Sequence, residues 1–323
     1  MKNILIIKST GLVKENINQI KKLYSSTSNI MVSADEFDSI YKIAKKNKIN
    51  ALIGCPRFIF TERLLSKLEN LEWVHNSGAG VEDYFFDSFT RSNITFTNGK
   101  IIQGPEVADH AVALLLSFTR NLNFLINNKN FKQKNYNRPI ELKDKKCLIF
   151  GLGGIGMCIA ERLKGFGMKI YAVSEELPYL SSFIDKYYTQ DDFSKISKDC
   201  DVVISSAPST KKTKNFFNKS TFNKMKKNSY FINVSRGNLV NTEDLINFLE
   251  KDFFLGVGLD VTDPEPLSKN HKLRKFKNVI ISPHLAGLSD YNRKRSFELI
   301  KLNIRRYLKN DHLLNIVDKK KEY

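Results

Sequence analysis

The segment Lys146–Gly156, which reads Lys-Cys-Leu-Ile-Phe-Gly-Leu-Gly-Gly-Ile-Gly, decides the fold of this chain. Its apolar start, Cys147–Phe150, is typical of a buried parallel strand, and apolar residues at helical spacing continue up to Gly165. Strand and helix are separated by glycines in the order G-x-G-x-x-G, at Gly151, Gly153 and Gly156. In a dinucleotide site such glycines allow a tight turn, a close approach of the backbone to a pyrophosphate, and close packing of helix on strand. The first N–H groups of the helix then face the phosphates, so we interpret the segment as a nucleotide site, with a purely structural turn as the alternative.

Length and composition indicate a globular protein of two domains. The chain has 323 residues, of which 41% are hydrophobic and 27% are charged. Its longest mostly apolar run, Val112–Phe118, is far shorter than the roughly 18 residues of a membrane-spanning helix. The segment Met1–Lys8 is expected to be a first strand and not a signal peptide. The scattered cysteines favour reduced thiols, because no C-x-x-C pair is present; they are Cys55, Cys147, Cys158 and Cys200. We therefore expect a cytoplasmic protein with no metal site and no membrane partner.

The net charge of +18 has two explanations. A polyanionic partner, either a nucleic acid or a membrane surface, is one of them. The other is that lysines fill the solvated faces of helices. Basic residues are spread along the whole chain and no nucleic-acid-binding motif is present, so we favour the second explanation and expect no nucleic-acid partner. The tail Lys319–Lys321 is expected to be a frayed terminus.

Residues 1–98 alternate strands and helices, which predicts a small open parallel sheet with helices on both faces. Ligands of such sheets lie at the carboxyl ends of the strands. Two of these ends carry unusual residues, Gly54-Cys55-Pro56-Arg57 and Asn76-Ser77-Gly78-Ala79-Gly80. The second exposes N–H groups that could hold a carboxylate, with a plain turn as the alternative. The predicted strands are Ile4–Ile7, Ile30–Val32, Ala51–Ile53, Trp73–His75 and Ile94–Thr97.

Residues 99–290 are expected to form a second, doubly wound domain that binds the dinucleotide. A long apolar helix, Ala108–Leu125, follows Pro105 and would cross between the domains, and Asn127–Arg138 is expected to be a linker or an arm. The helix at Asp290–Asn310 comes too late for the second sheet. We therefore expect residues 291–323 to join residues 1–98 in a substrate domain. The strands predicted after the glycine turn are Lys169–Val173, Val202–Ser205, Tyr230–Val234, Phe254–Leu259 and Val279–Ile281.

Three polar residues follow predicted strands of the second domain: Arg236, Glu265 and His284. An arginine can hold a substrate carboxylate and polarise a carbonyl. A histidine can give a proton to the carbonyl oxygen as a hydride arrives, and a neighbouring glutamate favours the imidazolium. Together these residues suit reduction of a 2-keto acid. Each alone also has a structural explanation, as a surface arginine, a rim glutamate or a core histidine.

Taken together, the local motifs resemble the D-isomer-specific 2-hydroxyacid dehydrogenase family, including its glyoxylate/hydroxypyruvate reductase-like members. The resemblance runs through nearly the whole chain in the order of the family. It rests on Gly78–Val81, Val107–His110, Gly151–Gly156, Pro208 with Thr213, Asn233–Gly237, Leu259–Val261 with Glu265–Leu267, and Ser282–His284 with Ala286–Gly287. It implies a Rossmann NAD-binding domain inserted in a flavodoxin-like substrate domain. It also implies an NAD(P)-dependent oxidoreductase in which Arg236, Glu265 and His284 are catalytic, passing a hydride between NAD(P)H and the keto carbon of a small 2-keto acid or D-2-hydroxy acid.

The same resemblance implies the other site residues. Substrate would be bound by the amides of Gly78, Ala79 and Gly80, and Arg57 is a further candidate for the pocket wall. Asp260 would hold the nicotinamide carboxamide. The cofactor-binding residues implied are Gly151, Gly153, Gly154, Ile155, Gly156, Ser174, Glu175, Ala207, Pro208, Thr213, Val234, Ser235, Asp260, Ala286 and Gly287. The family also implies a homodimer built on the nucleotide domains, with the active site in the cleft between domains.

Two departures from the family bear on the cofactor and on one helix. Ser174 stands where many members have aspartate; it tolerates a 2′-phosphate, but no arginine or lysine follows within several positions. Glu175 would repel that phosphate or bind the ribose hydroxyls itself, so we expect NAD in preference to NADP. Asp109 stands where members commonly have glutamate, which shortens the side chain and keeps the charge. The alternative from another functional class is a non-catalytic NAD-sensing binding protein of the corepressor type.

Overall fold

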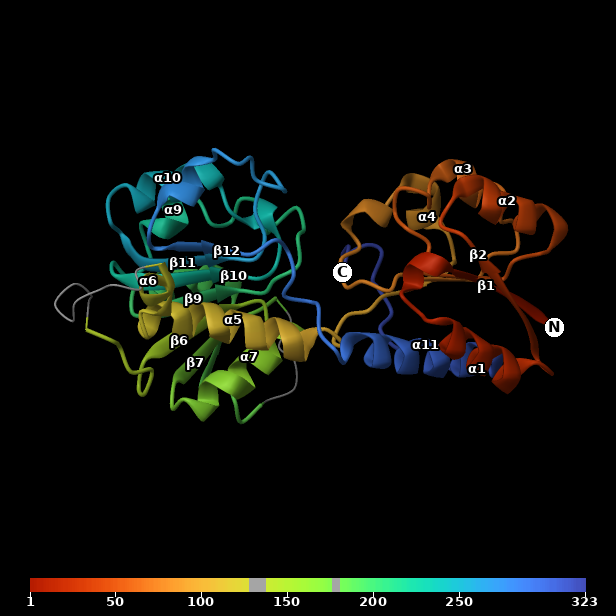
Figure 1. The fold of residues 1–323 in the computed structure, drawn as a ribbon, viewed down its shortest axis with the longest axis horizontal. Coiled ribbons are helices and arrows are strands. Elements are labelled where there is room, and N and C mark those ends of the chain that lie inside the picture. The colour runs from red at the N-terminus through yellow and green to blue at the C-terminus, as the bar shows by residue number, and fades with distance from the viewer. Residues whose placement is uncertain (128–137, 176–180) are drawn as a thin grey trace. The chain divides into compact units, whose positions relative to one another are not determined.

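The computed structural model describes residues 1–127, 138–175 and 181–323, and the chain forms two compact units (Figure 1). Unit 1 contains Met1–Ile102 and Ser289–Tyr323, and unit 2 contains Gln103–Leu288. Unit 1 extends beyond residue 98 because Asn98 and Lys100 remain hydrogen-bonded to the C-terminal segment. Asn98 donates to the Asn315 carbonyl at 3.1 Å and Lys100 Nζ to the Ile316 carbonyl at 2.8 Å. Most of the arm or linker expected at Asn127–Arg138 lies outside the described residues.

Unit 1 is built on a sheet of five parallel strands in the order β2-β1-β3-β4-β5. Alternate residues of a strand point to opposite faces, and this divides the core in two. Ile4 and Ile6 face α1 and α11, whereas Leu5 and Ile7 face α2, α3 and α4. Figure 1 shows these helices below and above the sheet, respectively. The elements are β1 Lys2–Ile7, α1 Lys14–Tyr24, β2 Ser28–Ser33, α2 Phe37–Lys46, β3 Ala51–Ile53, α3 Glu62–Leu65, β4 Trp73–His75, α4 Asp87–Arg91, β5 Thr95–Thr97 and α11 Asn292–Leu308.

Unit 2 is built on a sheet of seven parallel strands in the order β12-β11-β10-β9-β6-β7-β8. The predicted parallel α/β fold is therefore confirmed for both sheets. The edge strand β8 was not predicted, since its sequence Lys-Tyr-Tyr begins with a charged residue and contains no aliphatic side chain. The strands are β6 Lys146–Phe150, β7 Lys169–Val173, β8 Lys186–Tyr188, β9 Val202–Ser205, β10 Ser229–Asn233, β11 Phe254–Leu259 and β12 Val279–Ile281.

Helices cover both faces of this second sheet, with α5 and α7 below it and α9 and α10 above it in Figure 1. The prediction of one long helix at Ala108–Leu125 is wrong at both ends, and the observed helix already begins at Gly104. It ends at Thr119, because Asn121 has a left-handed φ of 57°, and a separate helix follows. The helices are α5 Gly104–Thr119, α6 Leu122–Asn127, α7 Gly154–Gly165, α8 Phe193–Ser197, α9 Lys219–Phe222 and α10 Thr242–Leu249.

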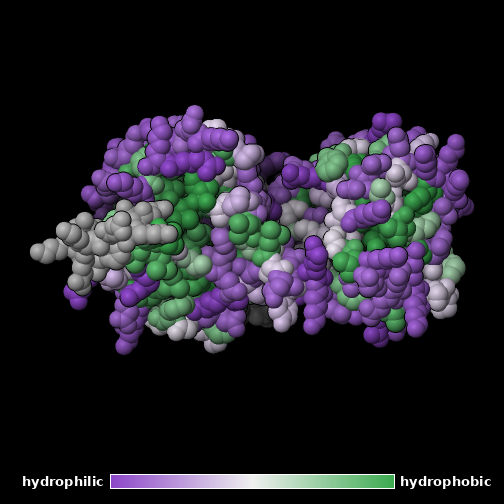
Figure 2. Space-filling model, in the orientation of Figure 1, coloured by the Kyte–Doolittle hydropathy of each residue, from purple (hydrophilic) through white to green (hydrophobic). Residues whose placement is uncertain are grey.

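The surface carries its charge on many separate elements. Hydrophilic side chains cover much of both units in Figure 2, and exposed lysine pairs lie in the last turns of two helices, Lys21 with Lys22 and Lys45 with Lys46. Positive charge is favourable there because it complements the helix dipole. The C-terminal tail is not frayed as expected, since Lys319 Nζ donates to the carbonyls that end α4, the nearest at 2.6 Å. None of the described helices combines the length and the apolarity needed to cross a membrane.

Candidate active site

In the glycine turn between β6 and α7, one glycine has free space where a side chain would lie, and the other two do not. A Cβ on Gly151, whose φ is 95°, would lie 2.4 Å from the Ala207 Cα, and a Cβ on Gly156 would lie 2.3 Å from the Gly151 oxygen. A Cβ on Gly153 would meet nothing within 4 Å, and no side chain caps the helix at that residue. The first amides of α7, on Gly154 and Ile155, therefore stand beside open space, which fits the pyrophosphate of a dinucleotide.

The loop after β9 forms a second side of this candidate nucleotide site. Its buried Ala207 packs on Gly151, and the Thr213 hydroxyl closes the turn by donating to the Pro208 carbonyl at 2.7 Å. The loop after the neighbouring strand, β10, is fixed by a hydrogen bond between two of its own side chains. The Ser235 hydroxyl donates to Asn233 Oδ1 at 2.7 Å, next to the buried Val234. Thr213 and Ser235 thus shape the backbone of these loops.

A lysine that the sequence did not reveal lies at the end of β7. Ser174 is half-buried there, and its N–H donates to the Tyr188 carbonyl at 3.2 Å. The adjacent Glu175 forms an ion pair with Lys212, which belongs to the loop after β9. The two partners are 37 residues apart in the chain, so reading forward from Ser174 could not find the lysine. The only hint in the sequence was the pair Lys211-Lys212 after a predicted strand.

The polar residues expected at strand ends lie along one edge of the second sheet, because β10, β11 and β12 are neighbours. His284 Nδ1 is 2.6 Å from Glu265 Oε1, and these side chains are 47% and 39% exposed. Arg236 is half-buried on the adjacent loop, and its Nη1 donates to the Ser235 carbonyl at 2.7 Å. The next residue, Gly237, touches the loop of Glu265 so closely that a Cβ would lie 2.0 Å from the Thr262 oxygen. His284 and Glu265 are thus in direct contact, and Arg236 is on a loop packed against theirs.

Asp260 organises the turn that carries His284. Its carboxylate is 2% exposed and accepts from the Ser282 hydroxyl at 2.7 Å and from the N–H groups of Leu285 and Ala286 at 3.0 and 3.1 Å. The turn needs this support, because His284 has a left-handed φ of 53°. A carboxylate has about four lone-pair positions, and these three hydrogen bonds leave one of them without a donor among the described residues. The expected contact with a nicotinamide carboxamide stays a prediction.

Two further side chains of this edge, His110 and Ser282, lie in motifs that carry the resemblance, but their contacts were not predicted. His110 on α5 places Nε2 at 2.8 Å from the Ser282 hydroxyl and 3.5 Å from Asp260 Oδ1. The hydroxyl of Ser282 donates its only hydrogen to Asp260, so His110 Nε2 must carry the hydrogen of the other contact. On the same helix, Asp109 accepts from Arg162 at 2.5 Å. At the other end of the turn, a Cβ on Gly287 would meet the Gln103 amide at 3.1 Å.

Two asparagine side chains fix the loop Gly78–Gly80 of unit 1 by donating to its carbonyl groups. Asn76 Nδ2 donates to the Gly80 carbonyl at 2.7 Å, and Asn98 Nδ2 donates to the Ala79 carbonyl at 2.6 Å. Nothing in the described ranges accepts from the N–H of Ala79 or Gly80. Those two amides are therefore available to a carboxylate, as the glycine-rich pattern predicts.

The other unusual strand end of unit 1 lies beside this loop. The Tyr84 hydroxyl links the two ends, at 3.2 Å from Asn76 Oδ1 and 2.7 Å from the Cys55 carbonyl. Cys55 itself is buried, and burial raises the pKa of its thiol to about 12, so it is neither a pocket wall nor a reactive thiol. Arg57 pairs with Asp83 at 2.5 Å, which neutralises its charge, while Phe58 is 75% exposed.

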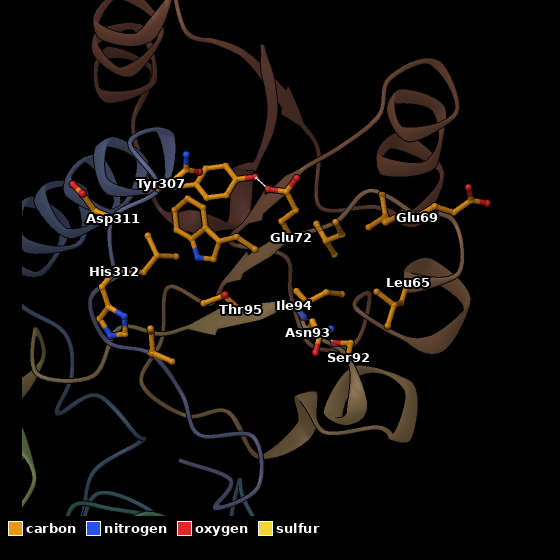
Figure 3. A pocket seen from close by; sticks show the side chains of 16 residues that line it. Leu65, Glu69, Glu72, Ser92, Asn93, Ile94, Thr95, Tyr307, Asp311 and His312 are labelled. Atoms are coloured by element: carbon orange, nitrogen blue, oxygen red, sulfur yellow. Dashed lines mark hydrogen bonds between the residues drawn. The ribbon is translucent and has the colours of Figure 1, made fainter.

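A pocket at the opposite end of unit 1 has a structural role (Figure 3). It is lined by Trp73 and Thr95, which begin β4 and β5, and Figure 3 shows Tyr307 pointing at Glu72. The Tyr307 hydroxyl donates to Glu72 at 2.6 Å, and burial together with this bond raises the pKa of Tyr307. Because ligands of open parallel sheets bind at the carboxyl ends of strands, we place no chemistry here. In the described part of the chain, no group of three or more His, Cys, Asp or Glu side chains could hold a metal ion.

Known proteins share both the sequence and the fold. The family described as "D-isomer specific 2-hydroxyacid dehydrogenase, NAD binding domain" matches residues 112–286. Glyoxylate reductase of Thermococcus litoralis is 30% identical over 86% of this chain and 86% of that protein. Glyoxylate reductase/hydroxypyruvate reductase of Homo sapiens is 30% identical over 71% of this chain and 73% of that protein. A D-isomer specific 2-hydroxyacid dehydrogenase family protein from Aeromonas salmonicida has a solved structure with a TM-score of 0.82 and 26% identity, covering 98% of this chain and 99% of that one. The chain therefore belongs to the D-isomer specific 2-hydroxyacid dehydrogenases and is an NAD(P)-dependent dehydrogenase.

Proposed function

We propose that the protein reduces the keto group of a small 2-keto acid, with glyoxylate and hydroxypyruvate as the first substrates to test. The observation that carries this proposal is the 2.6 Å contact between His284 Nδ1 and Glu265 Oε1 at the edge of the sheet that also carries the glycine turn. These substrates are the ones for which two relatives are named, glyoxylate reductase and glyoxylate reductase/hydroxypyruvate reductase.

The hydrogen bond between the two side chains supports a different role for each of them. Glu265 accepts from Nδ1 and orients the ring, which leaves Nε2 of His284 to face the substrate. Nε2 then gives its proton to the keto oxygen, while Arg236 binds and orients the substrate. When bound, the nicotinamide cofactor supplies the hydride that reduces the keto carbon. In the reverse direction, His284 takes the proton from the hydroxyl of a D-2-hydroxy acid.

The cofactor would be held by unit 2. We assign the pyrophosphate to the amides of Gly154 and Ile155, next to the open side of Gly153. Asp260 would bind the carboxamide with its remaining lone pair. Glu175 follows β7, the strand whose carboxyl end meets the adenosine ribose in doubly wound folds, and this supports NAD in preference to NADP.

The substrate carboxylate would be bound by unit 1. The N–H groups of Ala79 and Gly80 are the donors we assign to it, as part of the Gly78–Gly80 loop. Arg57 is a weaker candidate for this unit, because Asp83 already pairs with it. By analogy with the family we also propose a homodimer built on the nucleotide domains and a cytoplasmic location.

The test is a screen of keto acids with NADH and with NADPH, followed by absorbance, on the protein and on His284→Ala. Loss of general acid catalysis should lower turnover by roughly 10²–10⁴-fold, because this is what a positioned proton donor contributes. Dinucleotide binding should change little. His312→Ala is the matched control, since His312 is exposed in unit 1 beside the structural pocket and should leave turnover unchanged.

Two outcomes would contradict the proposal. Full turnover by His284→Ala would remove its role as the acid. Tight dinucleotide binding with no reduction of glyoxylate, hydroxypyruvate, pyruvate or bulkier keto acids would instead favour the non-catalytic, corepressor-type binding protein.

A further inference from the structure

The two amides that we assign to the substrate carboxylate belong to peptide groups whose carbonyls contact one and the same turn. The Gly78 carbonyl, which shares its peptide group with the Ala79 N–H, accepts from the Gly99 N–H at 2.8 Å. The Ala79 carbonyl, which shares its peptide group with the Gly80 N–H, accepts from Asn98 Nδ2 at 2.6 Å. A peptide group is planar, so a hydrogen bond that fixes its carbonyl also fixes the direction of its N–H.

The turn formed by residues 98–100 packs tightly against this loop. Asn98 is only 2% exposed, and its Oδ1 accepts from the Lys100 N–H at 3.2 Å, so the amide nitrogen is the atom that faces Ala79. A Cβ on Gly99 would lie 2.3 Å from the Ser77 oxygen. A shift of the turn therefore moves the loop with it.

The C-terminal segment is hydrogen-bonded to the same turn. The Asn98 N–H donates to the Asn315 carbonyl at 3.1 Å, and Asn315 Nδ2 donates to the Lys100 carbonyl at 2.6 Å. Lys100 Nζ returns a hydrogen bond to the Ile316 carbonyl at 2.8 Å. The segment lies beside β5, where Ile316 forms an antiparallel bridge with Thr97. The end of the chain thus fixes the turn that contacts the carboxylate loop.

We propose that Asn98 and Asn315 are positioning residues for the substrate carboxylate. Asn76 Nδ2 is a further donor to the Gly78 carbonyl, at 3.1 Å, so Asn98 acts mainly on the Gly80 amide. Asn315 acts through Asn98, because it keeps the turn in place. The hydrogen bonds to the carbonyls also polarise the peptide groups and strengthen their N–H groups as donors. This inference rests on the proposed function, since it concerns the carboxylate of the keto acid.

Steady-state kinetics of Asn98→Ala test the inference with the keto acid that the unmodified protein reduces best. KM should rise roughly tenfold, because a hydrogen bond to a charged group contributes about that factor to affinity. The turnover number should change less than about threefold, since the carboxylate is bound in the same way before and in the transition state. The methyl ester of the same keto acid has no carboxylate, so its kcat/KM should also change less than about threefold.

Asn315→Gly tests the contribution of the C-terminal segment. Asn315 has a left-handed φ of 56°, which glycine adopts readily, so this change removes the amide group and keeps the backbone conformation. We expect KM for the keto acid to rise roughly threefold to tenfold, with the turnover number and the kinetics of the methyl ester kept. If Asn98→Ala does not fold, this variant decides the question.

Lys319→Met is the matched control in the same segment. Lys319 Nζ donates to the carbonyls of Phe89 and Ser92 at 3.0 and 2.6 Å, at the end of α4 and away from the turn. Its removal should lower the melting temperature, as Asn315→Gly also should, because each loses hydrogen bonds of the C-terminal segment. KM for the keto acid should stay unchanged in Lys319→Met.

Unchanged KM values in Asn98→Ala and Asn315→Gly would overturn the inference while leaving the proposed function intact. The inference would also fail if Lys319→Met raised KM as much as they do, or if the methyl ester lost as much kcat/KM as the keto acid. Either result would mean that a loosened fold, and not the direction of the amides, weakens substrate binding. An unmodified protein that reduces no keto acid would overturn the proposed function and the inference together.

Discussion

Ser282 links Asp260 and His110 by hydrogen bonds at the carboxyl edge of the second sheet. Its hydroxyl donates to Asp260 at 2.7 Å and accepts from His110 Nε2 at 2.8 Å. Asp260 in turn holds the two N–H groups that follow His284, whose left-handed backbone is unfavourable without such bonds. One hydroxyl therefore connects α5 to the turn that carries the candidate acid.

Replacing Ser282 by alanine should disturb both stability and turnover. The change leaves a donor of His110 unpaired and removes a bond from the buried Asp260, which costs about 1–2 kcal/mol of unfolding free energy. We expect turnover to fall roughly tenfold, as a small misplacement of a proton donor does, with dinucleotide binding kept. Urea unfolding and steady-state kinetics measure the two effects.

Ser229→Ala is the matched control for this prediction. Its hydroxyl is buried in β10 and has no hydrogen-bond partner within the described residues. Removing an unsatisfied polar group should leave stability unchanged or increase it. If Ser282→Ala behaves like this control in unfolding and in turnover, the Ser282 contacts do not position His284.

At the level of elements, the turn from β6 to α7 contains two glycines with different expected roles. One is needed for folding and the other for binding the dinucleotide. Gly156→Ala places a Cβ 2.3 Å from the Gly151 oxygen, so the helix must move away from the strand. We expect this variant to lose about 1–3 kcal/mol of stability, the usual cost of overpacking.

Gly153→Ala should give the reverse result. Its Cβ meets nothing within 4 Å, so the fold should tolerate it, whereas the methyl group fills the space we assign to the pyrophosphate. Dinucleotide affinity should drop at least roughly tenfold, with the unfolding free energy kept within about 0.5 kcal/mol. Urea unfolding and fluorescence titration of the two variants distinguish these roles, and equal affinities would mean that the phosphate lies elsewhere.

Features with a pattern in one continuous stretch of sequence could be predicted, whereas several features that depend on contacts between distant residues were missed. The strand, glycine turn and helix of Lys146–Gly165 were predicted because their pattern is local. The end of α5 was missed because it depends on one residue, Asn121, in a left-handed conformation. Lys212 was missed because only the sheet order brings its loop to the end of β7.

At the scale of the whole molecule, unit 1 is made from both ends of the chain. Phe297 and Ile300 of α11 complete the core over Ile4 and Ile6 of β1, so the first sheet depends on the last helix. Because that helix follows the last strand of the second sheet, the sequence already suggested that it packs on the first sheet. The single tryptophan of the chain, Trp73, is fully buried in this unit, so its fluorescence reports the folding of unit 1 alone.

Unit 1 should lose stability in mild acid because of His75, whose ring lies 6.2 Å from that of Trp73. Burial lowers the pKa of His75 from 6.5 to about 4, and its Nδ1 contacts the Thr97 hydroxyl at 2.8 Å. The unfolded chain therefore takes up the proton first. The contribution of neutral His75 to the free energy of unfolding is complete above pH 6.5 and falls as the pH drops toward about 4, where the loss amounts to roughly 3 kcal/mol. Urea unfolding followed by tryptophan fluorescence should show this slope, and His75→Asn should remove it even if that variant is less stable overall.

His312→Ala, which changes an exposed histidine, should keep the slope. A slope that is the same in His75→Asn would mean that His75 is protonated in the folded protein or that other groups dominate.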